Sequence, residues 1–341
     1  MPDLHIGTLG IVGGGLIGSS IMRAARARGA AKRIVAIDAD ADVRERLEEL
    51  ALADAVRAPG ADAGAQIDHL ILAVPLGAMA RAVETLAPSL SAETVVSDVG
   101  SSKRSVMADM ARVLPHPARF VPAHPIAGTE QSGPDAGFAE LFAGRWCLLT
   151  PGPETDPEAL AQTRHFWEAL GAKVEEMDAG HHDVVLATTS HLPHLIAYSI
   201  VGTAAELEDI TRSEVIKFSA GGFRDFTRLA ASDPVMWRDV CLNNRDAVLQ
   251  MLEKFSADLD ALEASVRAGD GPALLDLFTR TRAVRRSIID AGQEVAAPDF
   301  GRRASTVEQE LADTQESSAP TEKNAHREVD APARAASPLA E

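Results

Sequence analysis

The chain has 341 residues, of which 46% are hydrophobic and only 4% aromatic. This length predicts two domains, with cores built mainly from aliphatic side chains. The net charge of −17 disfavours nucleic acid or an anionic membrane as a partner, because both would repel an acidic surface.

Cysteine usage and the N-terminal sequence favour the cytoplasm. Cys147 and Cys241 are too few and too far apart for a disulfide framework, and they fit a reducing compartment. No basic segment followed by an apolar one begins at Met1, and we see no uncharged apolar run of membrane-spanning length. We therefore expect a cytoplasmic protein without a membrane segment.

Short apolar runs alternate with helical patterns in the first half of the chain. The runs expected to form strands are Thr8–Gly13, Arg33–Asp38, His69–Val74, Thr94–Asp98, Arg119–Ala123, Arg145–Thr150 and Lys173–Met177. The segments expected to form helices are Leu16–Arg28, Ala41–Leu50, Gly77–Leu86, Lys103–Leu114 and Glu158–Leu170. This alternation predicts an α/β fold, with a doubly wound parallel sheet of the Rossmann type in residues 1–177.

The remainder of the chain has a different pattern. Residues 178–295 are expected to be all-helical, and in one helix apolar side chains recur from Val248 to Val266 at intervals of three and four residues. That seam could face its own core or a second subunit, and we favour the core. Residues 296–341 contain few large apolar side chains, so we expect a disordered tail.

A glycine motif opens the first helix. Gly13, Gly15 and Gly18 form a G-x-G-x-x-G pattern directly after a predicted strand, with Leu16 and Ile17 inside it. In this context the glycines permit a tight turn, close approach of a pyrophosphate and close packing of helix on strand. Free N–H groups at the start of the helix would attract that pyrophosphate. The motif predicts a dinucleotide site.

An acidic residue at the end of the second strand predicts which dinucleotide binds. Asp38 lies 20 residues after Gly18, where a carboxylate accepts hydrogen bonds from ribose hydroxyls and repels a 2′-phosphate. Asp40 adds to that repulsion, and no arginine follows immediately. We therefore predict NAD rather than NADP.

Two further strand ends are expected to line the same cleft. Val74 and Pro75 follow the third strand, and Asp98 ends the fourth. Ligands of open α/β sheets bind beyond the carboxyl ends of the strands, so we place these residues at the cofactor.

His124 is the candidate base. It follows the strand Arg119–Ala123 on the ligand side of the sheet, and imidazole titrates near neutral pH. Ser101 and Ser102 open the next helix after Asp98. Either serine could be only an N-cap, and Ser101 could also hydrogen-bond a substrate hydroxyl.

Histidines and one arginine in the helical part are candidates for substrate binding. The stretch from His181 to His194 lacks a nearby cysteine and the H-E-x-x-H signature, so we expect a polar network and no metal. Arg228 is suited by type to bind a carboxylate through two hydrogen bonds, and Asp225, about one helical turn earlier, could orient it.

Five motifs occur in order: Gly13–Gly18, Asp98–Lys103, His124–Gly128, Ser190–His194 and Asp225–Arg228. Together they resemble the prephenate dehydrogenase family over about residues 6 to 293. The resemblance implies NAD-dependent oxidative decarboxylation of prephenate to 4-hydroxyphenylpyruvate in tyrosine biosynthesis. A hydride leaves C4, the ring carboxylate departs as carbon dioxide, and the ring becomes aromatic. Arogenate, or both compounds, is the alternative substrate.

The resemblance also assigns roles to residues. His124 matches the histidine that accepts the proton of the C4 hydroxyl, and Ser101 matches a serine bonded to the same hydroxyl. Arg228 matches an arginine that anchors a substrate carboxylate. Trp237 matches a tryptophan that reaches the site from the other subunit of a homodimer formed through the helical domain. The remaining substrate-site residues that the resemblance implies are His194, Asp225, Gly221, His191, His182 and Asp183.

Two other functions remain open from the sequence. A generic β-hydroxyacid dehydrogenase would use a lysine of the helical domain for proton transfer, and that domain has few lysines. A nucleotide sensor that kept the fold would need no proton acceptor. One residue departs from the family pattern: Val99 stands where relatives often have glutamine.

Overall fold

The structure is a computed structural model, and it describes residues 6–129, 131–211 and 220–290. The predicted tail at 296–341 lies outside the described residues, as do residues 291–295 of the predicted helical domain. The limits 1–177 and 178–295 for the two domains stay a prediction.

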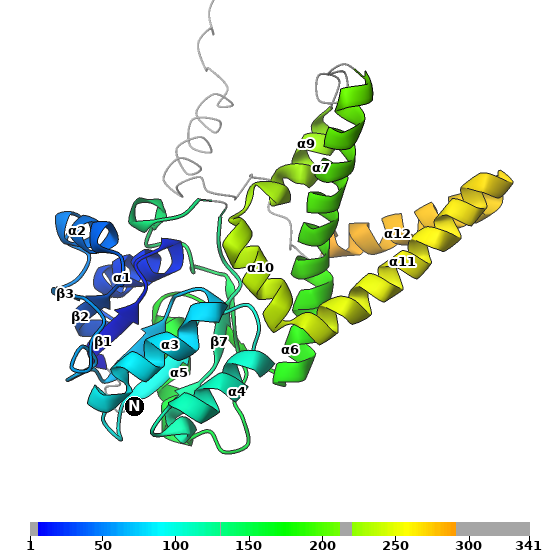
Figure 1. Cartoon of the computed structure of the whole chain (residues 1–341). Helices are drawn as coiled ribbons and strands as arrows, with labels where there is room; N and C mark the ends of the chain where they lie inside the picture. The colour runs from blue at the N-terminus through cyan, green and yellow to red at the C-terminus, as the bar shows by residue number, and fades with distance from the viewer. Residues whose placement is uncertain (1–5, 130, 212–219, 291–341) are drawn as a thin grey trace, which may run out of the picture. The chain divides into compact units, whose positions relative to one another are not determined.

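A six-stranded parallel sheet forms the first part of the chain, as predicted (Figure 1). Its strand order is β3-β2-β1-β4-β5-β6, which is the Rossmann order. The strands are β1 (Ile6–Val12), β2 (Ala31–Ile37), β3 (Ala55–Arg57), β4 (His69–Leu72), β5 (Val95–Asp98) and β6 (Phe120–Val121). Our sequence analysis missed the short edge strand β3.

The predicted strand Arg119–Ala123 is in fact divided. β6 belongs to the parallel sheet, whereas β7 (Ala123–Pro125) begins a second sheet with β8 (Trp146–Leu149) and β9 (Lys173–Glu176). Pro122 stands between β6 and β7, and a proline has no backbone N–H to donate to a ladder. His124 therefore lies within a strand of the second sheet, antiparallel to β8.

Helices cover both faces of the parallel sheet. Side chains of α1 (Leu16–Arg28) and α5 (Pro157–Ala169) join one buried cluster around Ile11 and Ile34. Side chains of α3 (Leu76–Leu86) and α4 (Arg104–Val113) join another around Leu70. The remaining helix of this part, α2 (Ala41–Glu49), contributes Leu47 to the first cluster. Short 3-10 turns lie at Ala87–Ser89, Pro117–Arg119 and Pro134–Ala136.

The second part of the described chain is helical, as predicted. α6 (Ala179–Leu186) continues through a π-helical turn (Ala187–His191) into α7 (Leu192–Thr211). Then follow α9 (Gly221–Thr227), a 3-10 turn (Arg228–Ala231), α10 (Pro234–Asn243), α11 (Arg245–Ala268) and α12 (Gly271–Asp290). Figure 1 shows α11 and α12 as a pair of neighbouring helices.

The apolar seam of α11 corrects one expectation. We favoured a seam that faces its own core, but within the described chain only its first member, Val248, is buried. Leu259 is 47% exposed and Val266 is 61% exposed. The single chain therefore leaves most of this seam accessible, which agrees with the other alternative, a face that meets a second subunit.

One helical run differs from what we expected of the sequence. Ala179–Glu206 is long and apolar enough to cross a membrane by length and composition, since an 18-residue stretch within it has a mean hydropathy of 1.4. Such a run is weak evidence of a membrane segment. It carries His182, Asp183 and His191, whose side chains face the candidate site described below.

Candidate functional site

The glycine loop has the geometry that close approach of a phosphate requires. Gly13 adopts φ +102°, and a Cβ there would lie 2.4 Å from the Ala73 carbonyl oxygen. A Cβ on Gly18 would lie 1.9 Å from the Gly13 oxygen, so helix α1 can pack against the loop only with glycine there. A Cβ on Gly15 would meet nothing within 4 Å, so the loop is open on that side.

Two residues of the loop lie at the start of the helix. Leu16 and Ile17 form the first turn of α1, and both are half-buried. Gly15 is the N-cap and supplies no side-chain acceptor, so no side chain caps this helix end. The amides of the first turn are therefore left for a bound anion.

Asp38 is fixed by backbone amides at the end of β2. Its carboxylate accepts hydrogen bonds from Gly14 N at 2.7 Å and from Asp40 N at 2.9 Å. The structure gives Asp40 a different role from the one we expected, because its side chain caps α2 by accepting from Asp42 N and Val43 N. Arg44 donates to the backbone oxygens of Asp38 and Ala39, so a guanidinium does lie beside this strand end.

Val74 and Pro75 lie where we expected them, between β4 and α3. Pro75 is the N-cap of α3, and the Val74 side chain faces Gly13. Asp98 ends β5, and its fully buried carboxylate accepts hydrogen bonds from Gly100 N, Lys103 Nζ and Ala123 N. Its predicted place beside the cofactor stays a prediction.

A buried ion pair clamps the strand end that precedes His124. Lys103 Nζ lies 2.5 Å from Asp98 Oδ2, and both side chains are fully buried. Lys103 Nζ also donates to the Ala123 carbonyl at 2.6 Å, and Ala123 N donates to Asp98 Oδ1 at 3.2 Å. Burial lowers the pKa of Lys103, and Asp98 opposes that shift. Both polar groups of the Ala123 backbone are thus held by one ion pair.

His124 lies immediately after this clamp and contacts the helical part of the chain. His124 Nδ1 is 2.9 Å from His182 Nε2, and His182 Nδ1 is 2.9 Å from Asp183 Oδ1. His182 is fully buried, and Asp183 and His124 are nearly so. Burial, followed by the neighbouring His182 and Lys103, lowers the pKa of His124 well below its ordinary value.

Asn244 connects these residues to His191, and our sequence analysis missed it. Asn244 Nδ2 donates to the Asp183 carbonyl at 2.7 Å and lies 3.1 Å from His191 Nδ1. His191 is fully buried, and burial lowers its pKa to about 4. Asn244 stands at the joint between α10 and α11, and an asparagine at a helix joint is not by itself a signal of function.

His194 and Trp237 form a stacked pair. Their ring centroids are 3.5 Å apart with an interplanar angle of 20°, and His194 Nδ1 donates to the Ser190 carbonyl at 2.8 Å. We expected Trp237 to reach the site of another subunit. In the described chain it lies beside His194 of its own subunit and packs in the cluster of α3 and α4, because α10 lies against α3.

Neither serine of the Asp98–Lys103 motif caps helix α4. The helix begins at Arg104 with Lys103 as its N-cap residue, and the Asp183 carboxylate accepts from the amides of both residues. Ser102 is fully buried, and its hydroxyl has no hydrogen-bond partner among the described residues. Ser101 is half-buried on the same loop.

The carboxylate-binding candidates lie around α9. Arg228 begins the 3-10 turn. Burial lowers the pKa of His194, and the nearby charge of Arg228 lowers it further. The exposed carboxylate of Asp225 lies 3.7 Å from Arg224, and its predicted role in orienting Arg228 stays a prediction. Gly221 begins α9 and is exposed.

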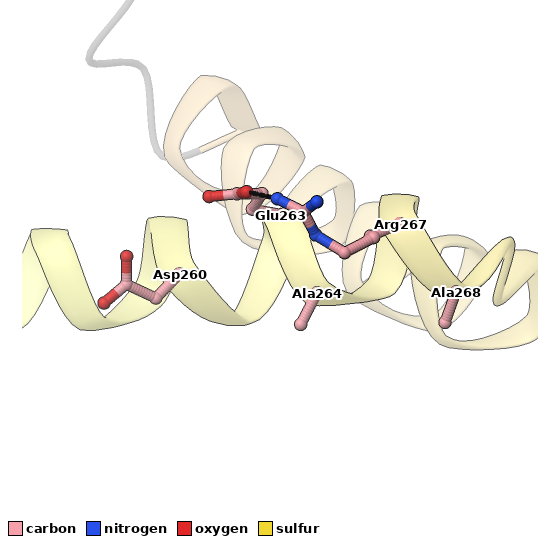
Figure 2. A pocket seen from close by; sticks show the side chains of 5 residues that line it. All are labelled: Asp260, Glu263, Ala264, Arg267 and Ala268. Carbon is pink, nitrogen blue, oxygen red and sulfur yellow. Dashed lines mark hydrogen bonds and ion pairs between the residues drawn. The ribbon is translucent and has the colours of Figure 1, made fainter.

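A metal cluster or a surface hollow would be another kind of binding site. The described residues contain no group of three His, Cys, Asp or Glu side chains that could hold a metal ion. A shallow hollow on α11 is lined by Asp260, Glu263, Ala264, Arg267 and Ala268, and Figure 2 shows that Glu263 and Arg267 pair with each other across it. All five residues belong to one helix, so the hollow encloses no ligand.

Comparison with known proteins agrees with this architecture. Residues 21–176 match the family model for the prephenate dehydrogenase nucleotide-binding domain, and residues 178–280 match the model for the prephenate dehydrogenase dimerization domain. The chain therefore belongs to the prephenate dehydrogenase family, which makes it an oxidoreductase.

Individual relatives match along most of their length. The cyclohexadienyl dehydrogenase of Zymomonas mobilis is 41% identical over 82% of this chain and 95% of its own. The prephenate dehydrogenase of Bacillus subtilis is 34% identical over 86% of this chain and 79% of its own. The crystal structure of prephenate dehydrogenase from A. aeolicus with hydroxyphenyl propionate and NAD⁺ superposes with a TM-score of 0.80 at 31% identity, covering 84% of this chain and 99% of that one.

The buried clamp predicts a large effect on stability. Lys103→Met leaves the Asp98 carboxylate buried without its partner, which typically costs about 3–5 kcal/mol. Urea unfolding at neutral pH measures the change. Lys254→Met is the matched control, because the pair of Lys254 with Asp258 is exposed and its loss should cost about 1 kcal/mol or less. Equal losses in the two variants would show that the clamp contributes little.

Proposed function

We propose that this chain catalyses the NAD-dependent oxidative decarboxylation of prephenate to 4-hydroxyphenylpyruvate. The observation that carries the proposal is the position of His124, which lies on a strand clamped to the end of β5 and is hydrogen-bonded to His182 of helix α6. Family membership supports the reaction class. Arogenate is the alternative substrate, and a relative named cyclohexadienyl dehydrogenase supports an enzyme that uses both.

Each candidate residue has a distinct task in this reaction. His124 accepts the proton of the C4 hydroxyl while the hydride leaves, so that positive charge does not build up on carbon. Ser101 donates or accepts a hydrogen bond at the same hydroxyl. Arg228 binds a substrate carboxylate, since a guanidinium matches a carboxylate with two parallel hydrogen bonds. His191, which lies beside Asn244, and His194, which stacks on Trp237, contribute further polar groups to the substrate site.

The glycine loop and Asp38 fit NAD. The side of the loop at Gly15 is open, the first turn of α1 has amides without side-chain acceptors, and Asp38 is fixed at the strand end where ribose hydroxyls bind. When bound there, NAD supplies the hydride acceptor. The residues of the chain position the substrate against it and take up the proton.

The two competing functions receive less support. The only lysine in the described residues after 178 is Lys254, which is exposed and paired with Asp258, so it is not placed to serve as the proton-transfer group of a β-hydroxyacid dehydrogenase. A nucleotide sensor has no need for buried histidines hydrogen-bonded to one another, because burial of such groups costs stability unless they are used.

Cys147 and Cys241 are free thiols, and we propose a cytoplasmic location on that ground.

Activity is tested by absorbance at 340 nm with NAD and either prephenate or arogenate. We expect turnover with at least one of the two, and side-by-side kinetics decide between them. His124→Asn keeps a polar side chain that cannot accept a proton near neutral pH, so turnover should fall by about 10²–10⁴-fold while NAD binding stays nearly intact.

The pH profile provides the control for this assignment. The neutral base is the active form, so turnover falls as pH drops through the pKa of His124, which burial places well below its ordinary value of 6.5. That acid limb should be absent in His124→Asn. If the variant keeps normal turnover and the same acid limb, another group is the base, and His191 or His194 is the next candidate.

Cofactor preference follows from Asp38. A 2′-phosphate beside this carboxylate costs about 3 kcal/mol of like-charge repulsion, so catalytic efficiency with NAD should exceed that with NADP by about 100-fold. Asp38→Asn should narrow the difference. Asp40→Ser preserves the cap of α2 and should change the preference less. Equal efficiency with both cofactors in the unmodified enzyme would overturn the assignment.

We also propose a homodimer formed through the helical part. Leu275 on α12 is 68% exposed, and Phe278 and Val266 are more than half exposed. Exposed large apolar side chains on neighbouring helices are typical of a face that a second subunit covers. Light scattering should give twice the chain mass, and Leu275→Glu should shift the equilibrium towards monomer. Ala161→Glu on the exposed side of α5 is the matched control. A fully active monomer at assay concentration contradicts the proposal.

A further inference from the structure

Three side chains in the site form a linear hydrogen-bonded chain that ends on a carboxylate. His124 Nδ1 meets His182 Nε2, and His182 Nδ1 meets Asp183 Oδ1, each at 2.9 Å. Both ring nitrogens of His182 are thus used within the protein, and the ring is fully buried. His182 is therefore not placed to bind substrate through its ring nitrogens, in contrast to what the sequence suggested.

The carboxylate at the end of the chain is held as an anion. Asp183 Oδ1 accepts from Lys103 N at 2.8 Å and Asp183 Oδ2 accepts from Arg104 N at 3.0 Å, at the start of α4. Burial alone would raise the pKa of Asp183, but the hydrogen bonds from His182 and these two amides outweigh it and hold the pKa below its ordinary range. Near neutral pH Asp183 can only accept hydrogen bonds.

Because Asp183 can only accept, it determines which ring nitrogen carries the hydrogen in each histidine of this hydrogen-bonded series. His182 Nδ1 must carry hydrogen to donate to Asp183, so a neutral His182 has its lone pair on Nε2. His124 Nδ1 must then be the donor to His182. A neutral His124 consequently has its lone pair on Nε2, the nitrogen that points away from His182.

We infer that His182 and Asp183 form a proton relay that fixes His124 as an Nε2 base and takes over its positive charge when it accepts the substrate proton. This inference rests on the proposed dehydrogenase reaction. His182 is the positioning residue in contact with the base, and Asp183 acts through His182. The arrangement has the logic of a Ser-His-Asp triad, in which the carboxylate selects the tautomer of the histidine.

The proton transfers balance as follows. The O–H bond of the substrate breaks as the Nε2–H bond of His124 forms, and the Nδ1–H bond of His124 breaks as the Nε2–H bond of His182 forms. His124 is then neutral, and His182 is an imidazolium beside the Asp183 anion. Burial and the charge of Lys103 lower the pKa of both His124 and His182. At His182 the hydrogen bond to the Asp183 anion opposes this lowering, whereas at His124 the neighbouring His182 adds to it. The reverse shift and loss of the Nε2 proton to water reset the site.

Other groups near the chain do not belong to it. His191 Nδ1 accepts from Asn244, so the ring of His191 is oriented by a different residue and carries its hydrogen on Nε2. Lys103 donates a hydrogen bond to the relay only through its backbone amide, since its ammonium group is bound to Asp98 and Ala123. The charge of that ammonium group still lowers the pKa of both His124 and His182. The relay therefore exchanges a proton with the substrate through one atom, the Nε2 of His124.

Nuclear magnetic resonance on ¹⁵N-histidine-labelled enzyme tests the tautomers without any substrate. At neutral pH both His124 and His182 should carry hydrogen on Nδ1 and none on Nε2, with assignments made from His124→Asn and His182→Gln. A hydrogen on Nε2 of neutral His124 overturns the inference. Because this measurement needs no turnover, its outcome is independent of whether the proposed reaction is correct.

Single-turnover kinetics test the transfer of charge. Asp183→Asn removes the anion, and the rate of hydride transfer should fall by about 10²-fold or more, with NAD binding unchanged. Asp178→Asn, on the N-cap of the same helix, should leave the rate unchanged. The same rate is then measured in mixtures of H₂O and D₂O and plotted against the deuterium fraction of the solvent. The plot should be curved for the unmodified enzyme, because two protons move in the step. For His182→Gln it should be a straight line, because only one proton moves.

These outcomes separate the relay from the reaction itself. If His124→Asn is inactive while Asp183→Asn and His182→Gln turn over normally, the relay is absent and His124 remains the base. If the unmodified enzyme oxidises neither prephenate nor arogenate, the proposed function fails, and the tautomers still decide whether the chain of hydrogen bonds is set as we infer. Thermal unfolding and NAD binding confirm that each variant is folded.

Discussion

The ion pair between Lys103 and Asp98 is the contact on which the geometry of the site depends. It is fully buried and holds both the N–H and the carbonyl group of Ala123. Such a pair gains little stability over apolar side chains of the same size, because burying two charges costs nearly as much as their attraction returns. What it supplies is position: His124 follows Ala123 directly, so β7 and the end of β5 are fixed to each other.

The same segment connects the two parts of the chain. The backbone amides of Lys103 and Arg104 hold Asp183, and Asp183 holds His182 against His124. Asn244 extends the connection to His191 through a bond to the Asp183 carbonyl. The Asp98–Lys103 motif, which lies at a strand end of the nucleotide-binding part, therefore also positions the histidines of the helical part. A substitution at either end of this series of contacts is expected to displace the residues at the other end.

Much of the architecture could be predicted from the sequence. Helix α1 has the predicted bounds, Leu16–Arg28, and opens at the predicted glycine motif, and the parallel sheet followed from the alternation of apolar runs and helical patterns. The errors have local causes. β3 has only three residues, all half-buried, which is too short to give a pattern, and Pro122 divides a run that looks like one strand in the sequence.

The candidate site was harder to predict than the fold. The motifs identified His124 and His182, but the bond between them joins residues 58 positions apart, and the bond from Lys103 N to Asp183 spans 80. Spacing in a sequence carries no information about such contacts. For this reason the clamp between Asp98 and Lys103 and the contacts of Asn244 were overlooked. Their roles could be described only once the strand ends and helices were placed in space.

The π-helical turn at Ala187–His191 has a consequence for how this enzyme can change during evolution. A π turn holds one residue more than an α turn, and each residue added to or removed from a helix rotates everything beyond it by about 100°. His182 lies before the turn and His191 at its end, and both face the same site. Substitutions in this segment therefore leave the directions of His191 and His194 unchanged. A single-residue insertion or deletion, by contrast, would rotate both histidines out of the active site.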